Sequence, residues 1–181
     1  MLVVLNGPPG IGKSTLARRF VDERPLSLCL EQDVVRQLLG GWLTRETESG
    51  LQARSLCLAM ARTHLLGGRD VIVPQFIALP DYLDQLAGIA DEVGACYLEL
   101  LLIDDAEAAE RRFHARALDP LWQEHQRLAE RFITDAGGYS HEFERLMTGL
   151  IGRTYIELRS TEVDLDGTYD ELMRELSRQS G

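Results

Sequence analysis

The residues best suited to chemistry form a glycine-rich stretch near the start of the chain. Residues 7–14 read Gly-Pro-Pro-Gly-Ile-Gly-Lys-Ser and match the pattern G-x-x-x-x-G-K-[ST] in full. Such a loop points its backbone N–H groups into a concave nest for phosphate, while its lysine reaches the β and γ phosphates and its hydroxyl binds Mg²⁺. The motif predicts ATP and Mg²⁺ as cofactors, with Ser14 as the metal ligand. The predicted ATP-binding residues are Gly7, Pro8, Pro9, Gly10, Ile11, Gly12, Lys13, Ser14 and Thr15.

The sequence around the loop fits this interpretation. Residues 2–6 are a continuous apolar run typical of a buried strand, and residues 13–21 carry apolar side chains at helical spacing. A helix that begins at Lys13 directs the positive end of its dipole at the bound phosphate. The strand, loop and helix follow one another with no spare residues, which makes a chance match improbable.

A second group with chemical potential follows the next apolar run, residues 26–30. It reads Glu31-Gln32-Asp33-Val34-Val35-Arg36. In a parallel sheet Asp33 would stand at the carboxyl end of a strand, the edge where nucleotides bind. A carboxylate there can accept the proton of an attacking hydroxyl, and a guanidinium three residues later can steady the transferring phosphoryl group. We expect Asp33 to act as general base and Arg36 to support the transfer, although Asp33 could instead cap a helix with Arg36 facing solvent.

Two further arginines lie four residues apart, after an apolar run at residues 96–103. Arg112 and Arg116 would share one helical face. From the spacing alone, these arginines could simply pair with nearby glutamates on a wet surface. Arg127 and Arg131 repeat the spacing and are weaker candidates.

The loop, Asp33-x-x-Arg36 and the later arginines resemble the small P-loop kinases that phosphorylate hydroxyl groups. This group includes gluconate kinase, chloramphenicol phosphotransferase and the kinase domain of phage polynucleotide kinase. In the last of these the residue that corresponds to Asp33 is the general base. In kinases that this chain resembles, arginines placed like Arg112 and Arg116 stabilise charge on the transferring phosphoryl group, which implies that role here, with Arg116 preferred. The resemblance implies a three-layer α/β fold with a five-stranded parallel sheet in the order 2-3-1-4-5, flanked by helices and carrying a helical lid.

One feature departs from many P-loop proteins. The third apolar run, within residues 70–76, lacks the acidic residue that often ends this strand and helps to hold Mg²⁺. Asp104 does end an apolar run, but it leads into the lid region and is better interpreted as a cap or anchor. Ser14, water and Asp33 are then left for the metal, while Gln75 is expected to face the substrate.

Alternating strand and helix signals predict one α/β domain over residues 1–181, with a lid at about 105–139. The helical region from Asp104 to Tyr139 exceeds what a simple crossover needs; Asp119-Pro120 splits it into two helices, and Gly137-Gly138 ends the second. An ordinary solvated pair of helices is the alternative to a lid. The fifth strand is expected at Thr161–Leu165, with Tyr155–Leu158 as the alternative.

Composition narrows the classes of function. The net charge is −10, from 29 acidic and 19 basic residues, which argues against binding of nucleic acid or an anionic membrane. No apolar run reaches the roughly 18 residues that a membrane span needs. Three scattered cysteines without C-x-x-C spacing indicate a reduced, cytoplasmic protein. The oligomeric state does not follow from the sequence.

These observations predict a phosphotransferase that moves the γ-phosphoryl group of ATP to a hydroxyl of a small molecule. The resemblance leaves open a kinase for nucleosides or polynucleotide 5′-hydroxyls. The missing acid of the third strand leaves open a non-catalytic ATP-binding regulator.

Overall fold

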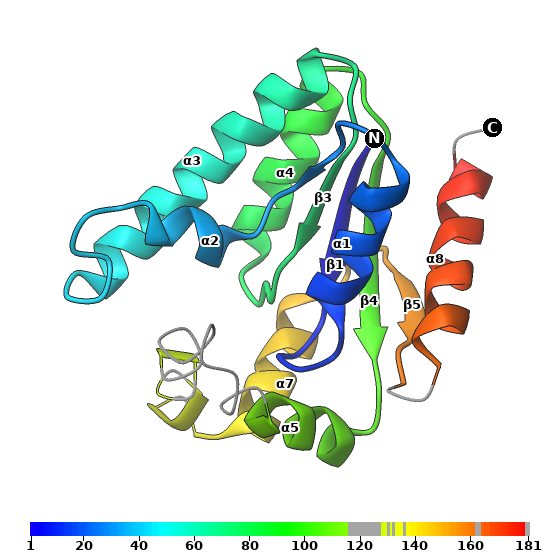
Figure 1. The fold of residues 1–181 in the computed structure, drawn as a ribbon. Helices are drawn as coiled ribbons and strands as arrows, with labels where there is room; N and C mark the ends of the chain where they lie inside the picture. The colour runs from blue at the N-terminus through cyan, green and yellow to red at the C-terminus, as the bar shows by residue number, and fades with distance from the viewer. Residues whose placement is uncertain (116–127, 130, 132, 136, 162–163, 180–181) are drawn as a thin grey trace. The chain divides into compact units, whose positions relative to one another are not determined.

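The computed structural model describes residues 1–115, 128–129, 131, 133–135, 137–161 and 164–179. Strands and helices alternate along most of the chain (Figure 1). The strands are β1 (Leu2–Asn6), β2 (Leu28–Cys29), β3 (Val71–Pro74), β4 (Tyr97–Ile103) and β5 (Ile156–Arg159). The helices are α1 (Lys13–Glu23), α2 (Gln32–Gln37), α3 (Glu46–Leu66), α4 (Pro80–Glu92), α5 (Ala106–Ala115), α7 (Tyr139–Gly149) and α8 (Leu165–Gln179).

The strands form a parallel five-stranded sheet in the order β2-β3-β1-β4-β5. Its centre is strongly apolar: residues 2–5 of β1 are fully buried, and so are residues 71–73 of β3. Strands covered on both faces read as continuous hydrophobic runs, which is why the sequence predicted them. The predicted fold class and strand order are confirmed.

The described residues gather into two compact units. The first comprises residues 1–5, 14–75 and 81–99. Within it α3 buries Ser49, Ala53, Cys57, Ala61 and Leu65, a stripe of mostly small side chains spaced four apart. Helices α3 and α4 lie side by side (Figure 1), and Arg62 of α3 forms an ion pair with Glu92 of α4.

The second unit comprises residues 6–13, 76–80 and the chain from residue 100 onward. It holds most of the phosphate loop, α5, α7, β5 and α8. Helix α8 buries Thr168, Tyr169, Leu172 and Leu176, positions that recur at helical spacing and pack one face of the helix.

The predicted fifth strand at Thr161–Leu165 is wrong, and the alternative at Tyr155–Leu158 is confirmed within one residue. Strand β5 pairs with β4, and Leu158 is its one fully buried side chain. Its flanking Glu157 and Arg159 are exposed, so the apolar signal was weak. Asp164 instead caps the N-terminus of α8, because its carboxylate accepts the Gly167 N–H at 2.8 Å.

The structure can also be compared with the sequence analysis for the cysteines, a membrane span and the predicted lid. The three cysteines are free thiols, of which Cys57 is buried, Cys29 is partly buried and Cys96 is exposed. Among the described helices, none has the length and apolar character to cross a membrane. Arg116, Asp119, Pro120 and Arg127, which belong to the predicted lid, lie outside the described residues.

Candidate functional site

The phosphate loop connects β1 to α1 in a tightly curled conformation (Figure 1). Gly7 and Gly10 have backbone φ values of +144° and +83°, which residues that carry a Cβ rarely adopt. The Lys13 ammonium donates to the carbonyls of Gly7 at 2.7 Å and Pro8 at 2.8 Å. Its side chain is 9% exposed, so the charge lies against the loop backbone.

Side chains from distant parts of the second unit hold this loop in shape. The Tyr139 hydroxyl donates to the Pro9 carbonyl at 2.6 Å, and the Ser160 hydroxyl donates to the Ile11 carbonyl at 2.7 Å. Asn6, 3% exposed, accepts from the N–H groups of Gly7 and Ile77 and donates to the Ile77 carbonyl. The loop is therefore preorganised by hydrogen bonds that use its carbonyls and leave most of its N–H groups out of these contacts.

The sequence did not predict these three supports. Tyr139 and Ser160 lie more than a hundred residues from the loop positions that they bind, and no spacing pattern marks them. Asn6 had a detectable signal, since it is the polar residue that ends a buried strand directly before Gly7.

Arg112, a predicted catalytic residue, contacts the loop as well. Its Nε donates to the Gly10 carbonyl at 3.0 Å, and its Nη2 pairs with the Asp104 carboxylate at 2.7 Å. Asp104 also accepts the Asp105 N–H at 2.8 Å, but the carboxylate that caps α5 is that of Asp105, which accepts the Ala108 N–H at 3.0 Å. In this arrangement Arg112 ties α5 to the loop backbone, and its predicted action on the phosphoryl group stays a prediction, like that of Arg116.

Substituting Gly10 by alanine is expected to destabilise the protein and weaken ATP binding. A Cβ at Gly10 would stand 2.5 Å from the Ala109 carbonyl oxygen and 2.8 Å from the Phe113 nitrogen, both backbone atoms of α5. Backbone strain at the positive φ alone costs about 1–3 kcal/mol. Urea unfolding should show a loss at least this large, accompanied by a higher Kd for ATP.

Gly88→Ala is the matched control for this variant. Gly88 lies within α4 and a Cβ there meets open space, so alanine should stabilise the helix by up to about 1 kcal/mol. A Gly10→Ala protein as stable as the wild type would contradict the close packing of α5 on the loop.

In the first unit Ser14 is hydrogen-bonded to an acidic residue, Glu31, to which the sequence motifs assign no role. The Ser14 hydroxyl donates to Oε2 of Glu31 at 2.9 Å, while Arg18 donates to Oε1 at 2.8 Å. Glu31 lies two residues after the end of β2 and is largely buried, whereas Arg18 is mostly exposed. Burial, followed by the Glu31 charge, raises the pKa of the nearby Cys29 thiol to about 12, so this thiol stays protonated.

Asp33 and Arg36 share α2 but differ in exposure. Asp33 is exposed in the first turn, while Glu31 occupies the N-cap position without a capping side-chain hydrogen bond. Arg36 is 6% exposed and donates to the Ser49 hydroxyl at 2.9 Å and the Glu46 carbonyl at 2.6 Å. Burial lowers the pKa of Arg36, partly offset by Asp33.

Arg36 is thus not the solvent-facing residue of the alternative interpretation. Its guanidinium also lies 5.9 Å from the centre of the Trp42 ring. These contacts fasten α2 to the start of α3 and so fix the helix that carries Asp33. The catalytic roles predicted for Asp33 and Arg36 stay predictions.

The donor set around Ser14 suits Mg²⁺. Among the described residues no cluster of three or more His, Cys, Asp or Glu side chains could hold a metal ion. Mg²⁺ in phosphate sites typically takes only one or two protein oxygens, with water and substrate phosphates completing the shell. One hydroxyl and one carboxylate, as in Ser14 and Glu31, meet that need.

The sheet order and the loop after β1 define a P-loop nucleotide-binding protein. Residues 2–137 match the AAA_33 family model, described as an AAA domain, and the chain belongs to this family. The predicted membership among small P-loop kinases is confirmed at the level of family and fold. No curated protein matches the sequence.

Solved structures with the same fold include three that span nearly the whole chain. A provisionally assigned kinase from Chloroflexus aurantiacus is 15% identical, with a TM-score of 0.67 and coverage of 98% of this chain and 96% of that one. APE1195 is 20% identical, with a TM-score of 0.59 and coverage of 99% and 94%. A gluconokinase from Sinorhizobium meliloti is 16% identical, with a TM-score of 0.54 and coverage of 99% and 97%.

Proposed function

We propose that this protein is a kinase that transfers the γ-phosphoryl group of ATP to a hydroxyl of a small molecule. The observation that carries the proposal is an exposed carboxylate, Asp33, in the first turn after β2 of a chain with a complete phosphate loop. Holding a nucleotide does not require this carboxylate, but activating a hydroxyl does. The fold shared with proteins described as kinases supports the same class.

The chemistry divides among the named residues. Residues 7–15 bind the ATP phosphates, and Lys13 offsets charge on the γ-phosphoryl group. Asp33 accepts the proton of the acceptor hydroxyl as its oxygen bonds to the γ-phosphorus and the bond to the bridging oxygen of ADP breaks. Arg36 keeps α2 in place, and Arg112 and Arg116 stabilise charge on the transferring group.

Glu31 replaces the acid that the third strand lacks. Ser14 and Glu31 would hold Mg²⁺, which neutralises phosphate charge when bound. Arg18 contributes by orienting the Glu31 carboxylate, since it occupies the oxygen that Ser14 does not use. This assignment removes the main sequence argument for a non-catalytic regulator.

Replacing Glu31 by glutamine is expected to raise the Mg²⁺ concentration for half-maximal activity about tenfold or more, because it removes the negative charge beside Ser14. ATP affinity measured without Mg²⁺ should change little. Glu48→Gln is the control, since Glu48 pairs with Arg45 at an exposed position. An unchanged Mg²⁺ dependence would show that Glu31 serves the fold alone.

The function itself is tested by incubating the protein with ATP and panels of sugars, sugar acids, nucleosides and 5′-hydroxyl oligonucleotides. Mass spectrometry should find an acceptor that gains one phosphoryl group while ATP becomes ADP. Transfer to nucleosides or oligonucleotides would favour the second class of acceptor predicted from the sequence. ATP binding without transfer to any acceptor would contradict the kinase proposal and favour a regulator.

A further inference from the structure

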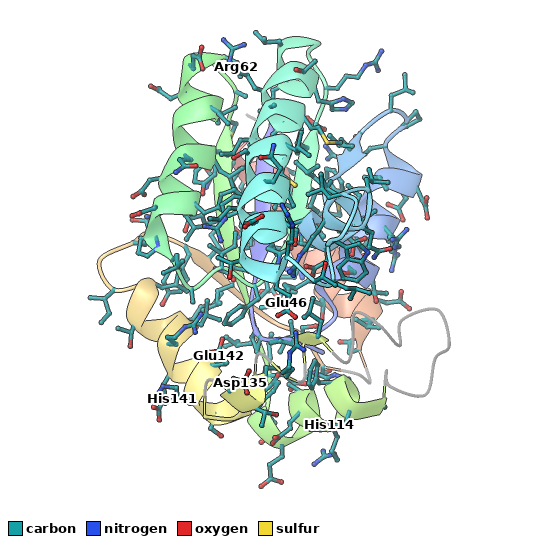
Figure 2. The ribbon with its side chains drawn as sticks, turned by 90° about the vertical axis from the view of Figure 1, so that its left-hand side faces the viewer. Glu46, Arg62, His114, Asp135, His141 and Glu142 are labelled. Atoms are coloured by element: carbon teal, nitrogen blue, oxygen red, sulfur yellow. The ribbon has the colours of Figure 1, made fainter. Side chains whose placement is uncertain are left out.

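Arg54 lies near the middle of α3, eight residues after Glu46, where the helix begins, and eight before Arg62; Figure 2 labels Glu46 and Arg62. Its guanidinium stands over the Tyr82 ring of α4, 4.9 Å from the ring centre. The Nε atom is buried, and no described residue accepts a hydrogen bond from it. A buried guanidinium N–H that makes no hydrogen bond costs folding free energy. We therefore expect a hydrogen-bond acceptor beside this atom.

Other arginines of the same unit have the partners that Arg54 lacks. Arg36 donates to a hydroxyl and a carbonyl, and Arg62 pairs with the Glu92 carboxylate. The ring of Tyr82 offers Arg54 a cation–π contact, but it satisfies none of the in-plane N–H donors. A guanidinium presents these donors as a fork that fits a carboxylate or phosphate group.

Tyr82 supplies a second buried donor at the same place, which no oxygen or nitrogen of the described residues accepts. Its side chain is 1% exposed, and its hydroxyl forms no hydrogen bond of normal geometry within the described chain. The Cys57 thiol lies beside it, but sulfur is a weak partner. Burial raises the pKa of Tyr82 well above its usual value, so the hydroxyl keeps its proton and can donate.

The pair lies close to the proposed base. Burial raises the pKa of Cys57 to about 11, the Tyr82 hydroxyl lowers it, and the Asp33 charge raises it. Helix α2, which carries Asp33, is fastened to the start of α3 by the hydrogen bonds of Arg36 to the Ser49 hydroxyl and the Glu46 carbonyl. The topology agrees, because α2 and α4 begin beyond the carboxyl ends of the neighbouring parallel strands β2 and β3.

We infer that Arg54 and Tyr82 bind an oxyanion of the phosphoryl acceptor, so that the acceptor is a hydroxyl compound carrying a carboxylate or phosphate group. This inference rests on the proposed kinase function and specifies its substrate class. An anionic acceptor must approach the Asp33 carboxylate, and a cation that is not already engaged offsets the repulsion. Among the described residues Arg54 forms a cation–π contact with Tyr82 but no ion pair, whereas Arg36 is held by its hydrogen bonds to α3.

The test compares matched acceptors in the intact protein: an aldonic acid against its alditol, and a sugar phosphate against its sugar. The wild type should prefer the anionic member of one pair. A preference for the aldonic acid would indicate a carboxylate group, and a preference for the sugar phosphate would indicate a phosphate group. Arg54→Gln should raise KM for that anionic acceptor about 10- to 100-fold and leave the neutral acceptor unchanged. Tyr82→Phe should have a smaller effect in the same direction.

Arg54→Lys keeps the charge but loses the fork of donors, so it should recover part of the preference for the anionic acceptor. It also provides a second test if Arg54→Gln folds poorly. Arg62→Gln, on the same helix and paired with Glu92, is the matched control and should behave as wild type. Equal losses for charged and neutral acceptors in Arg54→Gln would overturn the inference. A wild type that prefers the neutral members would overturn it too.

A calorimetric titration separates this inference from the proposed function. The aldonate and inorganic phosphate are titrated into wild type and Arg54→Gln without ATP. Binding by the wild type that the variant loses supports the oxyanion site even if no acceptor is phosphorylated, in which case the kinase proposal alone fails. Equal binding by both proteins, or by neither, overturns the site.

Discussion

Replacing Asp33 by asparagine is expected to lower phosphoryl transfer about 10²- to 10⁴-fold, the contribution of a well-placed general base. The amide is nearly the same size but cannot take the proton of the acceptor hydroxyl. Asp33 is exposed on α2, so the core should tolerate the change. Loss of a favourable charge in the first turn of a helix costs only about 0.3–1 kcal/mol.

The decisive comparison is between transfer and ATP binding in the same variant. ATP affinity should survive in Asp33→Asn, because the residues assigned to phosphate belong to the loop at 7–15. Asp22→Asn removes an equivalent exposed carboxylate from α1 and should leave both quantities unchanged. Undiminished transfer in Asp33→Asn would show that the base lies elsewhere.

The parts of this protein that the sequence predicted are those encoded by local pattern. The run Leu-Val-Val-Leu of β1 is apolar because both faces of a central strand are covered, and the loop motif follows it without interruption. The fifth strand was misplaced because β5 has one fully buried side chain, Leu158, and offers little pattern to detect.

The parts that escaped prediction depend on contacts between segments far apart in the chain. The sequence shows that the third strand lacks an acid, but it does not mark Glu31, which we propose in its place, because the hydrogen bond from Ser14 to Glu31 is set by packing rather than by spacing. Tyr139 is a stronger case, since 130 residues separate it from the carbonyl it binds. Arg54, which we propose as part of a binding site, was likewise not predicted, because its position within α3 gives no sign of a buried donor without a hydrogen bond.

Replacing Lys13 by methionine is expected to remove most of the activity. The ammonium is the one lysine charge in the chain, and it lies buried against the carbonyls of Gly7 and Pro8. In the ATP complex the ammonium is expected to bind the phosphates. Losing these charge-assisted hydrogen bonds, worth about 1.5–3 kcal/mol, should weaken ATP binding about 10- to 100-fold. Transfer should fall further, by about 10²- to 10³-fold, because a preorganised cation counts most where charge develops.

Arg19→Met, which removes an exposed charge from the same helix, is the control and should keep wild-type affinity and rate. The unique lysine also permits a direct test in the unmodified protein. An amine-specific reagent can modify only Lys13 and the N-terminus, and ATP should protect Lys13 while leaving N-terminal labelling unchanged. Labelling of Lys13 that ATP does not slow, together with wild-type transfer by Lys13→Met, would exclude this lysine from the phosphate site.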